Sequence, residues 1–320
     1  MMISVPYGEE RSTLSVPYRV DVVDVKPVPG AKDQGGEVEK VLNNPIGLKG
    51  LEYLVEKGSK VVVLVNDLTR STPTQLLLKP ILSKLEDLHP GEIKILIAPG
   101  THRVEDGDPE KILGKEILEK YEVLCHDAGD VEELAYLGRT SKGTPLSINK
   151  AVVEADLKIL TGDIEPHHIA GFSGGGKSIL PGVAGEEAIA HNHSLIIHPK
   201  ARVGVVEGNP LREDIEEATG MVKGVFILNA ILNQEREIVK CVAGDPHKAF
   251  LEGVKICRGI CEVEAHEADI VITSPGGFPR DINLWQAQKA LSHTDSMVKR
   301  GGVIIWVAEA RRGMGNKAFE

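Results

Sequence analysis

The chain has 320 residues, a net charge of −10 at pH 7 and a pI of about 5.6; 42% of its residues are hydrophobic and 26% are charged. This composition is typical of a globular protein with one large or two medium domains, and the acidic balance, without any run of Lys and Arg, argues against nucleic acid and anionic membranes as partners. No apolar run reaches the ~18 residues of a membrane helix, and the first residues lack the layout of a signal peptide.

The predicted elements begin with two alternating stretches, "ISVPYG" and "TLSVPYRVDVVDVKPV", which indicate an antiparallel edge hairpin. Short apolar runs follow, typical of strands buried on both faces; they end at Asp67, His102, Asp163, Leu232, near Gly277 and at Glu309. Amphipathic segments between them predict helices over 72–88, 108–121, 185–199, 209–222, 246–260 and 282–300. This alternation predicts an α/β protein with mainly parallel sheets.

A domain boundary is predicted near residues 262–268, where a polar stretch precedes a fresh strand-helix-strand unit. We therefore expect an N-terminal α/β domain over residues 1–265 and the start of a second α/β domain over residues 266–320. Because about 55 residues are few for a domain, the second domain is expected to be incomplete.

Polar side chains follow three of the predicted strands. Asp67, Thr69 and Arg70 lie in "NDLTRSTP", His102 lies in "PGTHR", and "TGDIEPHHIAGFSGGGKS" brings Asp163, Glu165, His167, His168 and Lys177. Each residue alone is equally well explained by helix capping, turn chemistry or a structural histidine. Ligands of open α/β sheets bind beyond the carboxyl ends of the strands, so the three groups together predict a site at one edge.

The segment Gly171–Ser178, "GFSGGGKS", fits the phosphate-binding P-loop pattern. A P-loop needs a strand that leads directly into its first glycine and a helix that starts at the Lys-Ser pair. Here the apolar strand run ends at Leu160, and Pro181 follows Ser178 too closely for a helix. The glycines instead predict a tight, poorly solvated loop, where Lys177 could act as a nucleophile or carry a covalent adduct. A solvated lysine on a flexible loop is the alternative.

The predicted helix over 185–199 carries His191, His193 and His198. Residues two positions apart on a helix point to nearly opposite sides, so His191 and His193 cannot both serve one site. Either one of them is a single imidazole ligand to a metal that is held mainly by another group, or all three are surface or capping histidines. Four cysteines without a C-x-x-C pair are interpreted as buried thiols rather than metal ligands, which favours a cytoplasmic location.

In this order the motifs resemble the nickel-dependent lactate racemase family of 2-hydroxy-acid racemases and epimerases. The similarity runs from about residue 60 to 315, through "NDLTRSTP", "GTHR", "EPHHIAGFSGGGKSILPG", "HNHS", "WQAQKAL" and "ARRGMG". The most specific block is 166–182, and its spacing to His193 fits the family.

The resemblance implies two α/β domains around a central cleft, and a nickel-pincer nucleotide, a pyridinium with two sulfurs and nickel, bonded covalently to Lys177. It implies His193 as the nickel ligand and His102 and His167 as the acid/base pair, with further cofactor contacts from Asp67, Thr69, Gly174 and Gly175 and substrate contacts from Arg70, Trp285, Gln286 and Lys289. The implied reaction is a proton-coupled hydride transfer that inverts a small 2-hydroxy acid, and the implied partners are the proteins that build the cofactor.

Two departures from the family pattern bear on the substrate. The first strand end reads N-D-L-T-R-S instead of D-D-H-T-R-P, and Trp285 stands where the lactate enzymes more usually have tyrosine, which leaves the identity of the 2-hydroxy acid open. The adjacent His168 leaves open which ring faces the site.

Three alternatives come from other functional classes. They are a P-loop enzyme that binds a nucleotide through Gly171–Ser178, a zinc or iron hydrolase built on His102, His167 and His193, and a non-catalytic relative that binds a small acid.

Overall fold

The computed structural model describes residues 1–25 and 27–315, and the chain divides into two compact units. The larger unit is Lys26–Cys261, and the smaller one combines Met1–Val25 with Glu262–Glu320. The units thus group the first 25 residues with the C-terminal segment. A compact unit is not by itself a domain. The predicted domains, 1–265 and 266–320, and the cleft between them therefore stay predictions.

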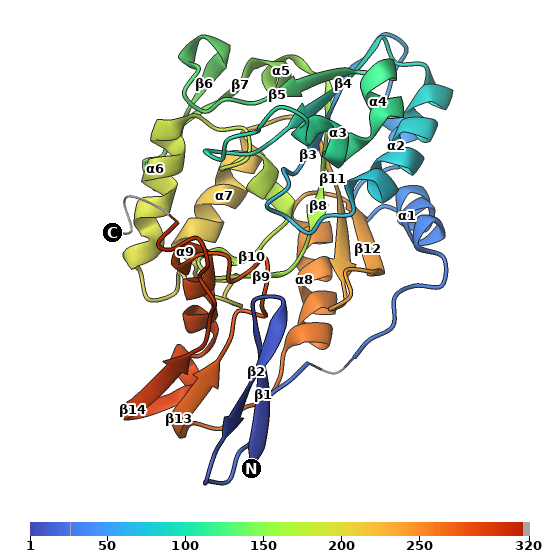
Figure 1. The fold of residues 1–320 in the computed structure, drawn as a ribbon. Coiled ribbons are helices and arrows are strands. Elements are labelled where there is room, and N and C mark those ends of the chain that lie inside the picture. The colour runs from blue at the N-terminus through green and yellow to red at the C-terminus, as the bar shows by residue number, and fades with distance from the viewer. Residues whose placement is uncertain (26, 316–320) are drawn as a thin grey trace. The chain divides into compact units, whose positions relative to one another are not determined.

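A six-stranded sheet forms the centre of the larger unit (Figure 1). Its strands lie in the order β12 (Ile238–Gly244), β11 (Val225–Leu232), β8 (Leu157–Asp163), β3 (Lys60–Val65), β4 (Glu92–Ile97) and β5 (Glu122–Cys125). All neighbours pair in parallel except β11 and β12, which are antiparallel. The predicted α/β class with a mainly parallel sheet is confirmed.

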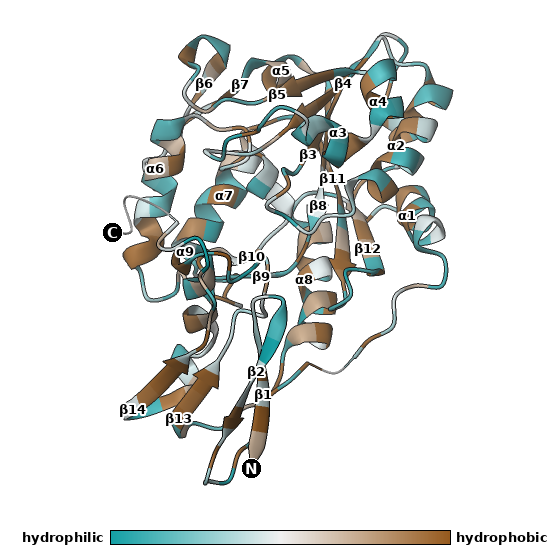
Figure 2. Cartoon of the chain, viewed as in Figure 1, coloured by the Kyte–Doolittle hydropathy of each residue, from teal (hydrophilic) through white to brown (hydrophobic). Residues whose placement is uncertain are grey.

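Helices cover both faces of this sheet, because alternate residues of each strand point to opposite sides. Val61, Val63 and Val65 of β3 pack with α1 (Gln34–Asn43), α2 (Thr74–Leu88) and α3 (Asp108–Leu113). Val62 and Leu64 belong to the second core, with α5 (Lys150–Glu154), α6 (Glu186–Ser194), α7 (Pro210–Gly220) and α8 (Lys248–Cys261). Figure 2 shows the strands mostly in the brown of hydrophobic residues, as burial on both faces requires.

The helix predicted over 108–121 is two short helices, α3 and α4 (Lys115–Lys120). Gly114 separates them with φ +82° and ψ 158°, a conformation that an α-helix cannot contain. Two small antiparallel pairs that the apolar pattern did not predict complete the unit: β6 (Leu134–Arg139) with β7 (Pro145–Asn149), and β9 (Pro166–His167) with β10 (Gly171–Phe172).

The smaller unit contains an N-terminal hairpin, β1 (Met2–Tyr7) and β2 (Glu10–Ser15), which forms its own two-stranded sheet. The prediction of a hairpin is confirmed, but its second strand was placed too late: of residues 13–28 only 13–15 belong to β2, and residues 16–25 form no strand. The strands β13 (Ala268–Thr273) and β14 (Val298–Trp306) pair in parallel. The predicted helix over 282–300 is wrong: α9 covers only Leu284–Ala287, and 3-10 turns follow at Gln288–His293 and Asp295–Met297. The parallel pairing with β13 takes residues from 298 onward into a strand.

Within residues 1–25 and 27–315, no helix is both long enough and apolar enough to cross a membrane.

Candidate functional site

The candidate site lies beyond the carboxyl ends of β8, β3 and β4, which are neighbours in the sheet. Because the three strands are parallel, the loops that follow them leave from one edge. Asp67 and Arg70 follow β3, His102 follows β4, and Asp163 is the last residue of β8. The predicted grouping at one edge of the sheet is therefore present in the fold.

Asp67 and His102 form a hydrogen-bonded pair between two of these loops. The Nδ1 atom of His102 lies 2.8 Å from Oδ2 of Asp67, and the hydroxyl of Thr69 donates to Oδ1 of Asp67 at 2.7 Å. Burial acts to raise the pKa of Asp67, but the hydrogen bonds from His102 and Thr69 and the charges of His102 and Arg70 outweigh it, and this pKa lies below its ordinary value. Asp67 is therefore a carboxylate that orients His102, whose side chain is 51% exposed.

Arg70 supplies positive charge to the same place. Its charge acts on the pKa values of Asp67, Asp163 and His167, so its guanidinium lies among these three groups. Among the described residues, that guanidinium makes no hydrogen bond or ion pair. A partly buried arginine in this state is suited to bind a carboxylate.

Asp163 is a buried carboxyl group at the end of β8, noted in the sequence but given no role there. Asn66 donates to the hydroxyl of Thr72 at 2.7 Å, and Thr72 donates to Oδ1 of Asp163, while Oδ2 is buried without a partner. Burial and the nearby charge of Glu165 raise the pKa of Asp163 to about 6, against the opposing effects of Thr72 and Arg70. The group ties the β3 loop to β8 and is protonated more readily than an exposed aspartate.

This raised pKa predicts a pH-dependent stability. The folded-state pKa lies above the ordinary value of 3.8, so the contribution of Asp163 to stability is complete below pH 3.8 and is lost as the pH rises through 6. The gap corresponds to about 3 kcal/mol at pH 8. We expect Asp163→Asn, which can still accept from Thr72, to raise the free energy of unfolding of the apoprotein at pH 8 by up to this amount and to flatten its change between pH 5 and 8 in urea titrations.

The matched control is Asp214→Asn, because Asp214 is equally buried but accepts hydrogen bonds from Thr140, Thr144 and Asn192. That variant should lose stability at both pH values. An Asp163→Asn protein that is less stable than the parent at pH 8, with unchanged pH dependence, would contradict the assignment.

The loop after β8 carries His167, whose ring is buried. Its Nδ1 atom accepts the backbone N–H of Ala170 at 3.2 Å and of Ile169 at 3.4 Å. Burial, followed by the charges of Lys177 and His168, holds the pKa of His167 well below its ordinary value. His168 stacks on the His167 ring with 4.6 Å between the ring centroids and is less buried. Of the two, His167 is the ring enclosed among Lys177, Arg70 and Arg212.

Lys177 lies close enough to two of the histidines to act on them. It sits in a four-residue 3-10 turn, Gly175–Ser178, and its charge acts on both His167 and His193. Burial, the charge of Lys177 and that of His102 lower the pKa of His193 to about 4, which keeps this imidazole neutral. Buried Asn192, which donates to Asp214 at 2.8 Å, anchors the helix α6 that carries His193.

A fully buried arginine stabilises the loop that carries Lys177 by hydrogen bonds to its backbone. Arg212 of α7 donates to the carbonyls of Ala170, Phe172 and Gly174, and its guanidinium lies over the Phe250 ring, 4.4 Å from the centroid. Asn229 of β11 accepts the N–H of Gly175 at 2.8 Å. Sequence reasoning missed both residues, because an arginine on an amphipathic helix is usually exposed and no pattern marks an asparagine within a buried strand.

The glycines of this loop pack against the protein itself. Gly174 and Gly175 have φ values of +77° and +59°, and a Cβ there would lie 2.7 Å from Ile164 and 2.9 Å from Phe250. Their predicted contact with a cofactor stays a prediction. No α-helix starts at Lys177, so the loop lacks the strand-loop-helix geometry of a P-loop.

Trp285, Gln286 and Lys289 belong to the smaller unit. The amine of Lys289 donates to Oε1 of Gln286 at 2.7 Å, so these two predicted substrate residues contact each other. Trp285 precedes Gln286 in α9 and is 37% exposed.

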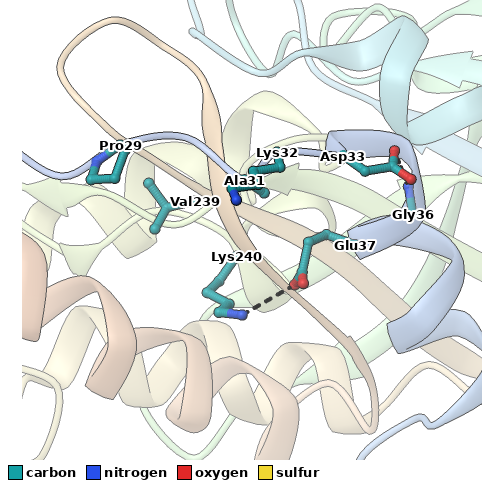
Figure 3. Close-up of a pocket in the computed structure, with 8 residues that line it drawn as sticks. All are labelled: Pro29, Ala31, Lys32, Asp33, Gly36, Glu37, Val239 and Lys240. Atoms are coloured by element: carbon teal, nitrogen blue, oxygen red, sulfur yellow. Dashed lines mark hydrogen bonds and ion pairs between the residues drawn. The ribbon is translucent and has the colours of Figure 1, made fainter.

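A hollow of about 240 Å³ adjoins the candidate site and is lined by Asp67, Arg70, Thr72 and Lys111, among others. A larger hollow of about 590 Å³ lies elsewhere in the same unit, between the start of α1 and β12 (Figure 3). There Lys240 pairs with Glu37 at 3.5 Å and Asp33 caps α1, so these three charged side chains stabilise the fold.

Within the described part of the chain, no three His, Cys, Asp or Glu side chains converge to hold a metal ion.

Known families and structures match the chain along most of its length. Residues 7–204 match the lactate racemase N-terminal domain and residues 263–320 the lactate racemase C-terminal domain. The lactate racemase of Thermoanaerobacterium thermosaccharolyticum is 38% identical over 99% of this chain and 76% of its own length, and that of Lactiplantibacillus plantarum is 37% identical over 88% and 68%. The structure of the lactate racemase apoprotein from the former organism superposes with a TM-score of 0.89, covering 99% of this chain and 76% of that one. The chain belongs to the lactate racemase family.

Proposed function

We propose that this protein is an isomerase that interconverts the enantiomers of lactate. The observation that carries the proposal is the arrangement at one sheet edge: the Asp67–His102 pair, the buried His167, an arginine with no partner among the described residues, and Lys177, whose charge acts on two neutral imidazoles. An inverting enzyme needs proton-handling groups on both sides of the reacting carbon, and imidazoles suit this at neutral pH.

The residues present fit a lysine-bound nickel-pincer nucleotide. Lys177 supplies the amine for the covalent bond, and His193 supplies one neutral imidazole, which is the state that coordinates a metal. One protein ligand would be enough for a nickel whose other donor atoms the cofactor itself supplies. When bound, this group supplies an acceptor for the substrate hydride.

The protein's own residues do the remaining work. Asp67 orients His102 so that its ring can take the proton of the substrate hydroxyl, and Arg70 binds the substrate carboxylate. Arg212 and Asn229 hold the loop that presents Lys177 and His167. Substrate contacts from Trp285, Gln286 and Lys289, and cofactor contacts from Thr69, Gly174 and Gly175, stay predictions.

The proposal extends to the cellular setting. Loading of Lys177 requires the proteins that build the cofactor, so these are the expected partners, and four free cysteines suit a reducing cytoplasm.

The test is to produce the protein together with the cofactor-building proteins and to follow lactate by chiral chromatography. We expect each enantiomer to give the racemic mixture, with about one nickel per chain and a mass increase that peptide mapping places on Lys177. A loaded protein that leaves lactate unchanged but inverts another 2-hydroxy acid would correct the substrate. A protein that carries the adduct and inverts no 2-hydroxy acid would overturn the proposal.

A further inference from the structure

The two site histidines are held through the same ring atom by opposite kinds of group. The Nδ1 atom of His102 lies 2.8 Å from a carboxylate oxygen of Asp67. The Nδ1 atom of His167 lies 3.2 Å from the backbone nitrogen of Ala170 and 3.4 Å from that of Ile169. A carboxylate can only accept a hydrogen bond, and a backbone N–H can only donate one. The partners therefore fix where each neutral ring carries its proton.

His102 carries its proton on Nδ1. Asp67 has no proton to give, because its pKa lies below the ordinary value, and the hydroxyl of Thr69 already donates to its other oxygen at 2.7 Å. The Nε2 atom of His102 then holds the lone pair, which makes it a proton acceptor.

His167 carries its proton on Nε2, because Nδ1 must hold the lone pair that accepts the two N–H groups. The charges that lower the pKa of this ring are those of Lys177, His168, Arg70 and Arg212. These charges and the burial of the ring both disfavour a second proton on His167, so the ring stays neutral.

We infer that in this arrangement of the loop His102 and His167 are not equivalent: His102 is the proton-accepting base, and His167 is a neutral hydrogen-bond donor through Nε2. A neutral imidazole can polarise an alcohol or keto oxygen with its N–H, but it does not give this proton away, since an imidazolate would result. The inference rests on the proposed function only for the identity of the oxygen that His167 contacts.

The arrangement has a consequence for the opposite enantiomer. Before His167 could accept a proton at Nε2, its present proton would have to leave and another would have to bind Nδ1. That change would displace the N–H groups of Ala170 and Ile169, whose contacts at 3.2 and 3.4 Å are long. The loop 167–170 must therefore rearrange when the roles of the two rings are exchanged.

Steady-state rates cannot test this asymmetry. Lactate enantiomers have equal free energy in an achiral solvent, so kcat/KM is the same in both directions for every variant of a racemase. The test must observe the rings directly.

We would label the histidines with ¹⁵N and record long-range ¹H–¹⁵N correlation spectra of the apoprotein at pH 8, where the pattern of a ring shows which nitrogen carries the proton. The variants His102→Gln and His167→Gln assign the two rings. If His167→Gln fails to fold, His168→Gln assigns the His167 signals through the loss of the stacked ring at 4.6 Å. Exposed His198, whose Nδ1 accepts the N–H of Lys200 at 3.2 Å, is the reference for a ring with its lone pair on Nδ1.

We expect the proton on Nδ1 for His102 and on Nε2 for His167. A His167 ring that is protonated on Nδ1, doubly protonated or averaged between both forms would overturn the inference, as would a His102 ring with its proton on Nε2. Because the apoprotein is used, the result does not depend on the proposed function: correct tautomers in a protein that does not racemise lactate once loaded would refute the function alone.

Discussion

Lys177→Arg is expected to abolish the covalent attachment of the cofactor and to lower lactate racemisation at least about thousandfold. A guanidinium does not form the amide-type bond that the lysine amine forms, but it keeps the positive charge that acts on His167 and His193. The substitution therefore separates the nucleophilic role of the lysine from its electrostatic one. Intact mass, nickel content per chain and chiral analysis of lactate, all after co-production with the cofactor-building proteins, measure the effect.

The same exchange at an exposed lysine of the same unit, Lys223→Arg, is the control and should retain mass increase, nickel and activity. Lys177→Ala should give the same loss of adduct and also remove the charge beside the two imidazoles. Full nickel content in Lys177→Arg would mean that the metal is held without the covalent group, and the proposed cofactor attachment would be wrong.

Continuous apolar runs made the central sheet readable from the sequence, because strands buried on both faces need apolar side chains at every position. The strand β3 was recognised for this reason, since residues 61–65 are all apolar and buried. The antiparallel edge strand β12 was missed, because its connection to β11 contains no Gly-based turn signal, although Arg236 adopts φ +65° there. The 282–300 helix was wrong because a helical spacing of apolar residues does not report the strand pairing that competes for residues 298–306.

The chemical groups of the candidate site could be predicted from the sequence, but the residues that fix its loops could not. Asp67, His102, His167 and Lys177 follow strands or sit in a glycine-rich loop, and both are local signals. Arg212 lies 35 residues from Lys177 in the sequence, so no local pattern connects the two. Only the packing of α7 against the loop brings its guanidinium to three loop carbonyls. Likewise, the sequence left open whether His167 or His168 enters the site, and the proposal of His167 is supported by its burial and by backbone N–H groups that no residue pattern encodes.

Asp67→Asn is expected to lower lactate racemisation by about 10²–10⁴-fold while leaving the Lys177 adduct and nickel in place. Thr69 donates its hydroxyl proton to Oδ1 of residue 67, so the amide oxygen of the substituted side chain is held on the Thr69 side and its NH₂ group faces His102. The ring must then accept at Nδ1 and carry its proton on Nε2, where it can no longer take the proton of the substrate hydroxyl. Racemisation rates, the mass of the loaded protein and the ¹⁵N spectrum of His102 measure the three parts of this expectation.

Thr69 makes it possible to distinguish a changed His102 tautomer from a simple loss of the negative charge of Asp67. Without the Thr69 hydroxyl, the amide introduced by Asp67→Asn is free to turn its oxygen toward His102 and restore the proton to Nδ1. The double variant Asp67→Asn with Thr69→Val should therefore be more active than Asp67→Asn alone, although Thr69→Val by itself removes a contact of the native carboxylate. A tautomer mechanism requires this non-additive recovery. If the double variant is as inactive as Asp67→Asn, or worse, the negative charge of Asp67 and not the orientation of its oxygen is what His102 needs.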